Sequence, residues 1–341
     1  MTYNCSPEKL HIELSKKLKP SLAWHKGTCV FSHAEEGKKK LIELLGLDTF
    51  EKCEPDIKIV KEELLNGSKH IHFLVQTEIG YYANCHLLFP KGYNEGKLPL
   101  LTCLQGHVSG AHLGLGIRKY DYDDAYIKNE RVDFCIQAIE RGFIALAIEQ
   151  RGFGENGGEA DTGHTRCAHA SMGAILLGRC LIGERVWDVM RVLDAVLSYF
   201  GDKITLDGSV LIGMSGGGTA TYYTACLDDR FSVYVPSVSL CSFSESIIER
   251  NHCTCNYVPK IAKYFDMGDM ATMIAPKKLV IVSGTYDKWF PIDGAIKEYR
   301  KIEQIYKAIE KEDNCRLVQC EGDHRFYYEA WDTIMSLLKN Q

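Results

Sequence analysis

The sequence predicts an α/β protein built on one mixed, mostly parallel sheet with helices on both sides. Two short strands joined by a tight turn come first, and buried strands then alternate with amphipathic helices. This order makes the later strands parallel neighbours in one sheet. With 341 residues, 45% hydrophobic and 25% charged, the chain suits one large core. We expect a main domain over residues 61–341 and an N-terminal helical extension, 1–60, packed on it.

Each expected element follows from its own pattern. Apolar residues at three- and four-residue spacing predict surface helices at 7–18 and 35–46. Alternating and aromatic-rich runs predict a hairpin of 71–77 and 81–89 across the turn 78–80. Continuous apolar runs and helical periodicity predict the rest. The expected strands are 98–104, 143–149, 208–213, 231–236, 278–284 and 315–320, and the expected helices are 134–141, 181–199, 219–227 and 326–338.

The most informative motif is GMSGG at 213–217, which matches G-x-S-x-G between an expected strand and an expected helix. That context is typical of a nucleophile elbow, in which a serine occupies a strained turn at a helix N-terminus. Small neighbours prevent clashes, and the backbone N–H groups favour a developing oxyanion. Ser215 is therefore the candidate nucleophile. The alternative is a plain glycine-rich turn, since the chain contains 30 glycines.

A serine nucleophile needs a base and an acid that orients the base. Asp287 follows the expected strand 278–284, and His324 follows the last expected strand. Both thus lie at carboxyl ends of parallel strands, where catalytic groups gather. Asp293 is the rival acid but fits better as the N-cap of the next helix. His252, in a short cysteine-containing segment, is expected to have ordinary loop or cap chemistry.

The loop after the strand 98–104 should supply a second oxyanion donor. It begins with LQGH at 104–107, so we expect the backbone N–H groups of His107 and Gly216 to form the oxyanion hole. A plain glycine-rich turn is again the alternative. Four neighbouring side chains are candidates for lining the substrate pocket: Gln105, Met214, Arg151 and Trp289.

Composition excludes several classes of function. The net charge is −5 and no long basic block is present, so nucleic acid is not an expected partner. The sequence contains no apolar run of 18 residues, so no membrane association is expected. The first residues lack the apolar core of a signal peptide, which favours a cytoplasmic protein. The sequence leaves the oligomeric state open.

The chain has 14 cysteines, which in a cytoplasmic protein are expected to be reduced thiols. Cys253 and Cys255 form the one closely spaced pair that could suggest a metal. Their C-x-C spacing differs from that of a zinc knuckle, and no second cysteine pair is close in the sequence. We therefore expect no metal site.

Taken together, these motifs resemble those of α/β-hydrolases. Over roughly residues 60–340 the chain is most similar to the bacterial acetyl xylan esterase-related group of dienelactone-hydrolase-like enzymes. Two departures stand out, because Glu149 replaces the usual Asp of an Asp-x-Arg-Gly turn and Gln105 replaces the usual His of His-Gly. The resemblance rests on LQGH (104–107), EQRGFGE (149–155), LGRCLIGERVWD (177–188), GMSGG (213–217), YVP (257–259), MGD (267–269), GTYDKWFP (284–291) and GDHRF (322–326).

The resemblance implies an α/β-hydrolase fold, a Ser215–Asp287–His324 triad and ester hydrolysis through an acyl-enzyme, without a cofactor. The expected substrate is a small-molecule ester, such as a small acetylated carbohydrate. Insertions at 107–130, 152–178 and 237–277 should lie over the active site and set substrate choice. A thioesterase, a lactonase or a serine peptidase would share the triad, although the chain has no room for the β-propeller of prolyl-oligopeptidases. An inactive hydrolase-fold binding protein is the alternative from a different class.

Overall fold

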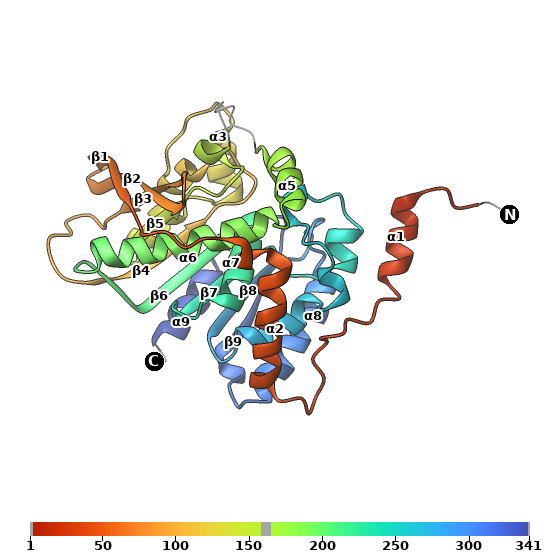
Figure 1. Cartoon of the computed structure of the whole chain (residues 1–341). Helices are drawn as coiled ribbons and strands as arrows, with labels where there is room; N and C mark the ends of the chain where they lie inside the picture. Colours follow the sequence, from red (N-terminus) through yellow and green to blue (C-terminus); the bar gives the residue numbers. More distant parts are fainter. Residues whose placement is uncertain (1–2, 158–164, 340–341) are drawn as a thin grey trace.

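The computed structural model describes residues 3–157 and 165–339, and its described part contains one nine-stranded sheet (Figure 1). The spatial order is β1-β2-β3-β5-β4-β6-β7-β8-β9. Neighbours from β1 to β5 pair antiparallel, whereas every pair from β5 through β4 to β9 is parallel. The predicted mixed, mostly parallel sheet is confirmed. The strands are β1 Ile57–Leu65, β2 Ser68–Glu78, β3 Tyr81–Leu88, β4 Leu98–Leu104, β5 Ile144–Ile148, β6 Ile204–Met214, β7 Val233–Ser237, β8 Lys278–Gly284 and β9 Cys315–Cys320.

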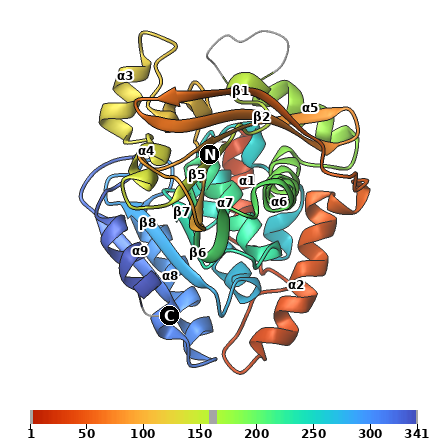
Figure 2. The ribbon, with the colours of Figure 1, turned by 90° about the vertical axis from the view of Figure 1, so that its left-hand side faces the viewer.

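Helices cover both faces of this sheet, and Figure 2 shows α6 and α9 on opposite sides of it. Because side chains alternate along a strand, Leu100 of β4 enters the core beneath α2, α6, α7 and α8, whereas Leu101 enters the core beneath α4 and α9. The described helices are α1 Pro7–Ser15, α2 Val30–Leu45, α3 Asp123–Ala125, α4 Phe134–Ile139, α5 Cys167–Leu176, α6 Leu181–Phe200, α7 Gly216–Leu227, α8 Ile292–Lys307 and α9 Ala330–Lys339. None of these described helices is long and apolar enough to cross a bilayer.

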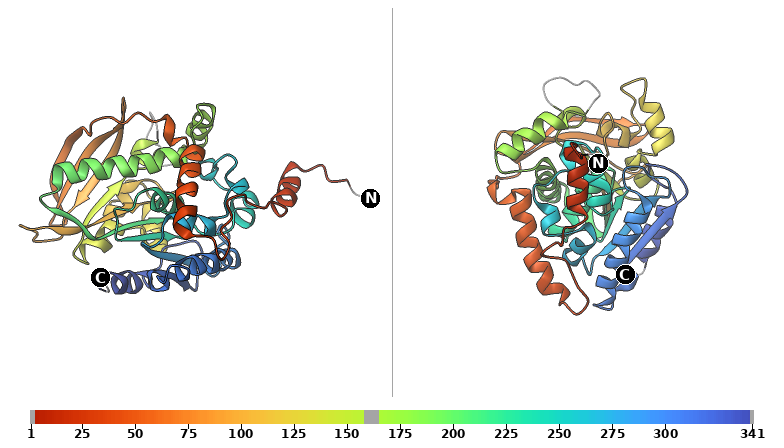
Figure 3. Two further views of the ribbon diagram at one scale, coloured as in Figure 1. Left: turned by 60° about the horizontal axis from the view of Figure 1, so that its bottom comes forward. Right: turned by 90° about the vertical axis from the view of Figure 1, so that its right-hand side faces the viewer.

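The first 60 residues behave as two different parts. Helix α2 packs on the body, with Leu41 and Leu45 fully buried. Helix α1 projects away from the body and buries none of its residues (Figures 1 and 3). The boundary expected between residues 60 and 61 falls inside β1, an edge strand that the sequence pattern did not predict. Most of β1 is exposed, so its sequence lacks the apolar run by which the inner strands are recognised.

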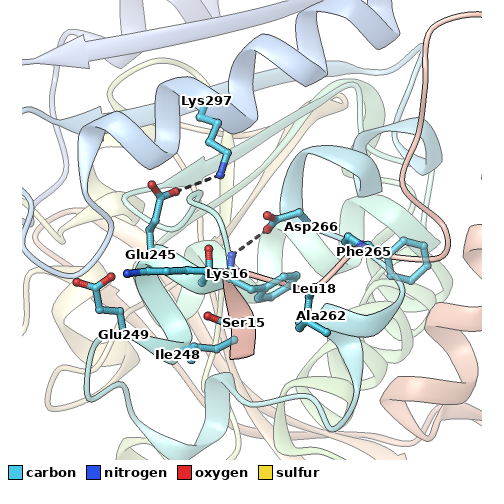
Figure 4. A pocket seen from close by; sticks show the side chains of 13 residues that line it. Ser15, Lys16, Leu18, Glu245, Ile248, Glu249, Ala262, Phe265, Asp266 and Lys297 are labelled. Carbon is cyan, nitrogen blue, oxygen red and sulfur yellow. Dashed lines mark hydrogen bonds and ion pairs between the residues drawn. The ribbon is translucent and has the colours of Figure 1, made fainter. Parts of the chain in front are cut away.

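The end of α1 forms one wall of a cavity of about 270 Å³, shown in Figure 4. Phe265 and Ile248 contribute apolar lining, and Lys297 and Glu245 make an ion pair of 3.5 Å across one side. The residues that line this cavity include none of the predicted site residues. The predicted site residues lie elsewhere, at the carboxyl ends of the parallel strands.

Candidate active site

Ser215 lies in the sharp turn between β6 and α7 with φ 54° and ψ −119°. A side chain in this region of backbone space is strained, which is the expected property of a nucleophile elbow. The turn also needs its glycines, because a Cβ at Gly213 would collide with the carbonyl oxygen of Gly217, and one at Gly217 with that of Leu104. Helix α7 begins at Gly216, so its unpaired first-turn N–H groups lie beside the serine.

The candidate acid and the candidate base, Asp287 and His324, lie in loops after β8 and β9. His324 Nδ1 is 2.8 Å from Asp287 Oδ2. The other carboxylate oxygen, Oδ1, accepts hydrogen bonds from the backbone N–H groups of Trp289 (2.8 Å) and Phe290 (3.0 Å). Asp287 is only 4% exposed, so these bonds fix the orientation of its carboxylate and, through it, that of the imidazole.

The rival acid, Asp293, is in the first turn of α8, and Pro291 is the residue at the N-cap position. The expectation that Asp293 caps the helix is therefore wrong by two positions. Proline is favoured near a helix start because its φ is already suitable for a helix. Helix α8 therefore begins at Ile292, one residue before Asp293. His324 bonds to Asp287 and not to Asp293 in the described structure.

Ser215 and His324 line one cavity of about 340 Å³. Of the four pocket candidates, Met214 and Trp289 line this cavity and Gln105 and Arg151 do not. The remaining lining residues come from four separate loops. They are Gly106, His107, Tyr126, Glu130, Asn251, His252, Cys253, Asn256 and Phe290.

Gln105 is buried at the start of the loop after β4, where its side-chain amide donates to Glu149 Oε1. Glu149 Oε2 accepts from the backbone N–H of Ala111 at 2.8 Å. Burial raises the pKa of Glu149 to about 8. The two departures from the family pattern thus meet in one hydrogen bond. Gln105 is a support for the loop before His107, which corrects its assignment to the pocket wall.

Arg151 is also structural. Its guanidinium makes two hydrogen bonds to Asp188 of α6, at 2.8 and 2.9 Å, and lies 3.3 Å from Glu78 Oε2 at the end of β2. It also stacks on Tyr81 at 3.9 Å from the ring centroid. These contacts hold the turn after β5 against α6, and Arg151 lines a different cavity, together with Tyr81 and Glu184.

One predicted oxyanion donor, Gly216, follows Ser215 directly, and the other, His107, belongs to the loop after β4. A Cβ added at Gly106 would be 3.1 Å from the Cβ of Ser215, so the loop after β4 passes directly beside Ser215. Within the described chain, no acceptor is bonded to the backbone N–H of His107. That group and the N–H of Gly216 are accordingly available to a ligand oxygen in the cavity.

Among the polar side chains in this cavity that sequence reasoning did not place there, three carry a proton that they can lose or gain: Glu130, His252 and Cys253. Burial raises the pKa of Glu130 to about 7, and the charges of His324 and Asp323 act on it in opposite directions. Burial lowers the pKa of His252 to about 4, and its Nε2 lies 3.0 Å from Ser246 Oγ. Cys253 approaches His107 and two further cysteines. His252 and Cys253 belong to an irregular loop and Glu130 ends a π-helix of five residues, Tyr126–Glu130; neither segment is long enough to give a periodic signal that marks a residue as facing a cavity.

A serine elbow after β6, an acid after β8 and a histidine after β9, on a mostly parallel sheet, define the α/β-hydrolase fold. The protein has this fold.

No protein-family model matches the chain. It is 27% identical over 297 residues to "Putative hydrolase YtaP" of Bacillus subtilis (strain 168), which covers 85% of this chain and 93% of that protein. A solved structure of a "putative acetyl xylan esterase" from Bacteroides fragilis NCTC 9343 has a TM-score of 0.76 at 16% identity and covers 93% of this chain and 82% of the other. Acetyl xylan esterase 1 from Thermoanaerobacterium sp. JW/SL YS485 has a TM-score of 0.60 at 16% identity, with 99% of each chain covered. The predicted resemblance to acetyl xylan esterase-like α/β-hydrolases is confirmed at the level of the fold.

Proposed function

We propose that this protein is a serine hydrolase of carboxylic esters, with Ser215, His324 and Asp287 as its catalytic triad. The observation that carries the proposal is that a strained Ser215 shares one cavity with His324, whose ring is bonded to a buried Asp287. The similarity to a curated hydrolase and to solved acetyl xylan esterases supports the same reaction class.

In this mechanism, His324 takes the proton from Ser215 as the serine oxygen attacks the ester carbonyl. Asp287 holds the ring with Nδ1 protonated and stabilises the imidazolium. The N–H groups of His107 and Gly216 donate to the carbonyl oxygen as it becomes negative, and losing one such donor typically raises the barrier by about 3 kcal/mol. The alcohol leaves with the proton from His324, and water then releases the acyl group by the same steps.

The proposed substrate is a small ester, with an acetylated carbohydrate as the leading example. A cavity of about 340 Å³ is near the lower end of the sizes of ligand pockets, roughly 300–1,000 Å³. Trp289 and Phe290 give it an apolar side suited to an acetyl group or a sugar face. None of the 14 cysteines forms a disulfide, which supports a cytoplasmic location as part of the proposal.

The first experiment compares hydrolysis of p-nitrophenyl acetate, butyrate and octanoate by the wild type and by Ser215→Ala. We expect a preference for acetate and a loss of kcat of at least about 10⁴-fold in the variant. The thermal unfolding of both proteins is measured alongside, because the small change should leave the fold intact. A fluorophosphonate probe should label the wild type only. A wild type that neither turns over the esters nor accepts the probe would contradict the proposal and favour a non-enzymatic binding role.

A further inference from the structure

Four metal-ligating side chains meet at the edge of the cavity that contains Ser215. They come from distant parts of the sequence: His107 from the loop after β4, Cys167 from the start of α5, and Cys253 and Cys255 from the 3₁₀ turn Thr254–Asn256 and the residue before it. Their ligand atoms all lie within 4.8 Å of one another. His107 Nε2 and Cys255 Sγ are 3.1 Å apart. We refer to these four residues as the thiol site.

We propose that the thiol site binds one Zn²⁺ ion through three thiolates and one imidazole. Three Cys and one His in a tetrahedron form one of the standard structural zinc sites. With Zn–S bonds of about 2.3 Å, neighbouring ligand atoms of a tetrahedron are about 3.8 Å apart. The observed separations require only small side-chain adjustments to reach that geometry. Soft thiolate ligands select Zn²⁺ over Mg²⁺ or Ca²⁺.

The charges around the site support this assignment. Arg185 of α6 is 1% exposed, and its Nη2 is 3.3 Å from Cys167 Sγ. The other partners of Arg185 are uncharged. Its Nε and Nη2 donate to the backbone carbonyl oxygen of Arg151, and its guanidinium lies over the ring of Phe153. Among the described residues no carboxylate pairs with Arg185, and its Nη1 has no hydrogen-bond partner. A buried guanidinium needs a negative partner.

The zinc-loaded site would provide that negative partner. Three thiolates and one neutral imidazole around Zn²⁺ carry a net charge of −1, which the charge of Arg185 balances. The shell around the site is largely closed, since Phe153, Leu181, Cys167 and Cys255 form a small buried cluster with Ala170 and Cys253 at its edge. Four protein ligands and a shielded position describe a structural zinc site, in contrast to a catalytic one with an open position.

The site has a direct connection to the oxyanion hole. The ring of His107 lies so close to Gly216 that a Cβ there would be 2.9 Å from Nδ1. A metal on Nε2 would therefore hold His107 in place against Gly216. The backbone N–H groups of these two residues are the two proposed oxyanion donors. The zinc assignment itself rests on the four ligands and Arg185, and it does not depend on the proposed reaction.

The test uses the full chain, purified after removal of any affinity tag, with its metal content measured by inductively coupled plasma mass spectrometry. We expect one zinc ion per chain in the wild type and in Cys226→Ser, and none after dialysis of Cys255→Ser. Cys226 is a matched control, because it is as completely buried as Cys255 and lies outside the thiol site. Wild type without zinc after growth with added Zn²⁺, or equal zinc in both variants, would overturn the proposal.

A second measurement on the wild type covers the case in which Cys255→Ser fails to fold. Replacement of zinc by Co²⁺ should give the intense visible bands of a tetrahedral site and near-ultraviolet thiolate charge transfer. Removal of the metal by a chelator from the native protein should expose three further thiols to a disulfide reagent. If the thiol count is the same before and after chelation, or the Co²⁺ spectrum is that of an octahedral aquo ion, the four residues are a reduced thiol cluster and the zinc assignment is wrong.

Discussion

Two neighbouring regions of the cavity are built in different ways. The triad loops, residues 213–217, 284–291 and 320–326, each follow directly from a strand of the parallel part of the sheet. The thiol site draws its ligands from loops and a helix start that are separated by up to 148 residues. The first region is positioned by backbone pairing, and the second by side-chain packing between irregular segments.

This difference explains which functional residues can be predicted from a sequence. Parallel strands bring their carboxyl ends to one edge of the sheet, so the position of a motif that follows such a strand can be predicted from its sequence context alone. The position of a residue in an irregular loop cannot be predicted in this way. Cys253 and Cys255 are close in sequence, yet they meet their partners His107 and Cys167 only when the loops pack against one another.

The largest expected effect tests whether the triad loops act as one unit. In Asp287→Asn, the backbone N–H groups of Trp289 and Phe290 will retain the side-chain oxygen, so the new NH₂ group will face His324 Nδ1. The imidazole must then carry its proton on Nε2, where it cannot accept one from Ser215. We expect kcat for p-nitrophenyl acetate to fall by about 10⁴-fold.

The same Asp287→Asn protein should keep its zinc content, because the substitution leaves the thiol site untouched. A fall in kcat of less than tenfold would mean that another group orients His324. A loss of zinc would show that the triad loops and the thiol site are coupled and do not form two separate regions.

The second prediction concerns Arg151, which the structure removes from the substrate pocket. Arg151→Ala leaves the buried carboxylate of Asp188 without its cation, and Glu78 loses one of its two partners. We expect the free energy of unfolding to fall by about 3 kcal/mol, with KM for small esters unchanged. Denaturant titration and steady-state kinetics separate the two effects. A rise in KM at unchanged stability would return Arg151 to the pocket wall.

The third prediction tests the contact between the two departures from the family pattern. Gln105→His and Glu149→Asp each change one side of a buried hydrogen bond, and each alone should destabilise the protein. Together they install the residues usual in the family, so the double variant should recover part of the loss. A double-mutant cycle on unfolding free energies should give a coupling of about 1 kcal/mol. Strict additivity would mean that the two positions are independent.

The smallest expected effect concerns Glu130, which lines the cavity near His324. Burial raises its pKa to about 7, so the side chain is neutral below that pH and negative above it. The negative form favours the imidazolium that develops on His324. Relative to Glu130→Gln, the wild type should therefore gain a few-fold in kcat/KM as the pH rises through about 7.

The contribution of Glu130 to stability has the opposite pH dependence. Because the pKa is raised in the folded state, the neutral carboxyl contributes stability that is present at acidic pH and is lost as the pH rises through about 7. Unfolding free energies of wild type and Glu130→Gln should therefore diverge as the pH rises from about 4.5 to about 7 and differ by a constant amount above that, with the variant the more stable. Parallel pH profiles of activity and of stability in the two proteins would remove Glu130 from the cavity chemistry.

The class of fold, most element positions and the candidate triad of Ser215, Asp287 and His324 could all be predicted from the amino-acid sequence. This is possible because the spacing of apolar residues indicates helices and strands, and because a motif that follows a parallel strand lies at the carboxyl edge of the sheet. The sequence pattern missed β1, an exposed edge strand without an apolar run.

The side chains that surround Ser215 follow from the three-dimensional packing of the loops and could not be predicted from the sequence. The tertiary structure placed Gln105 and Arg151 in supporting contacts outside the cavity, brought Glu130 and His252 into it, and assembled the thiol site from three separate segments. The physical reason is that the orientation of a loop side chain is set by packing and hydrogen bonds with partners that are remote in sequence, and no local pattern encodes those partners.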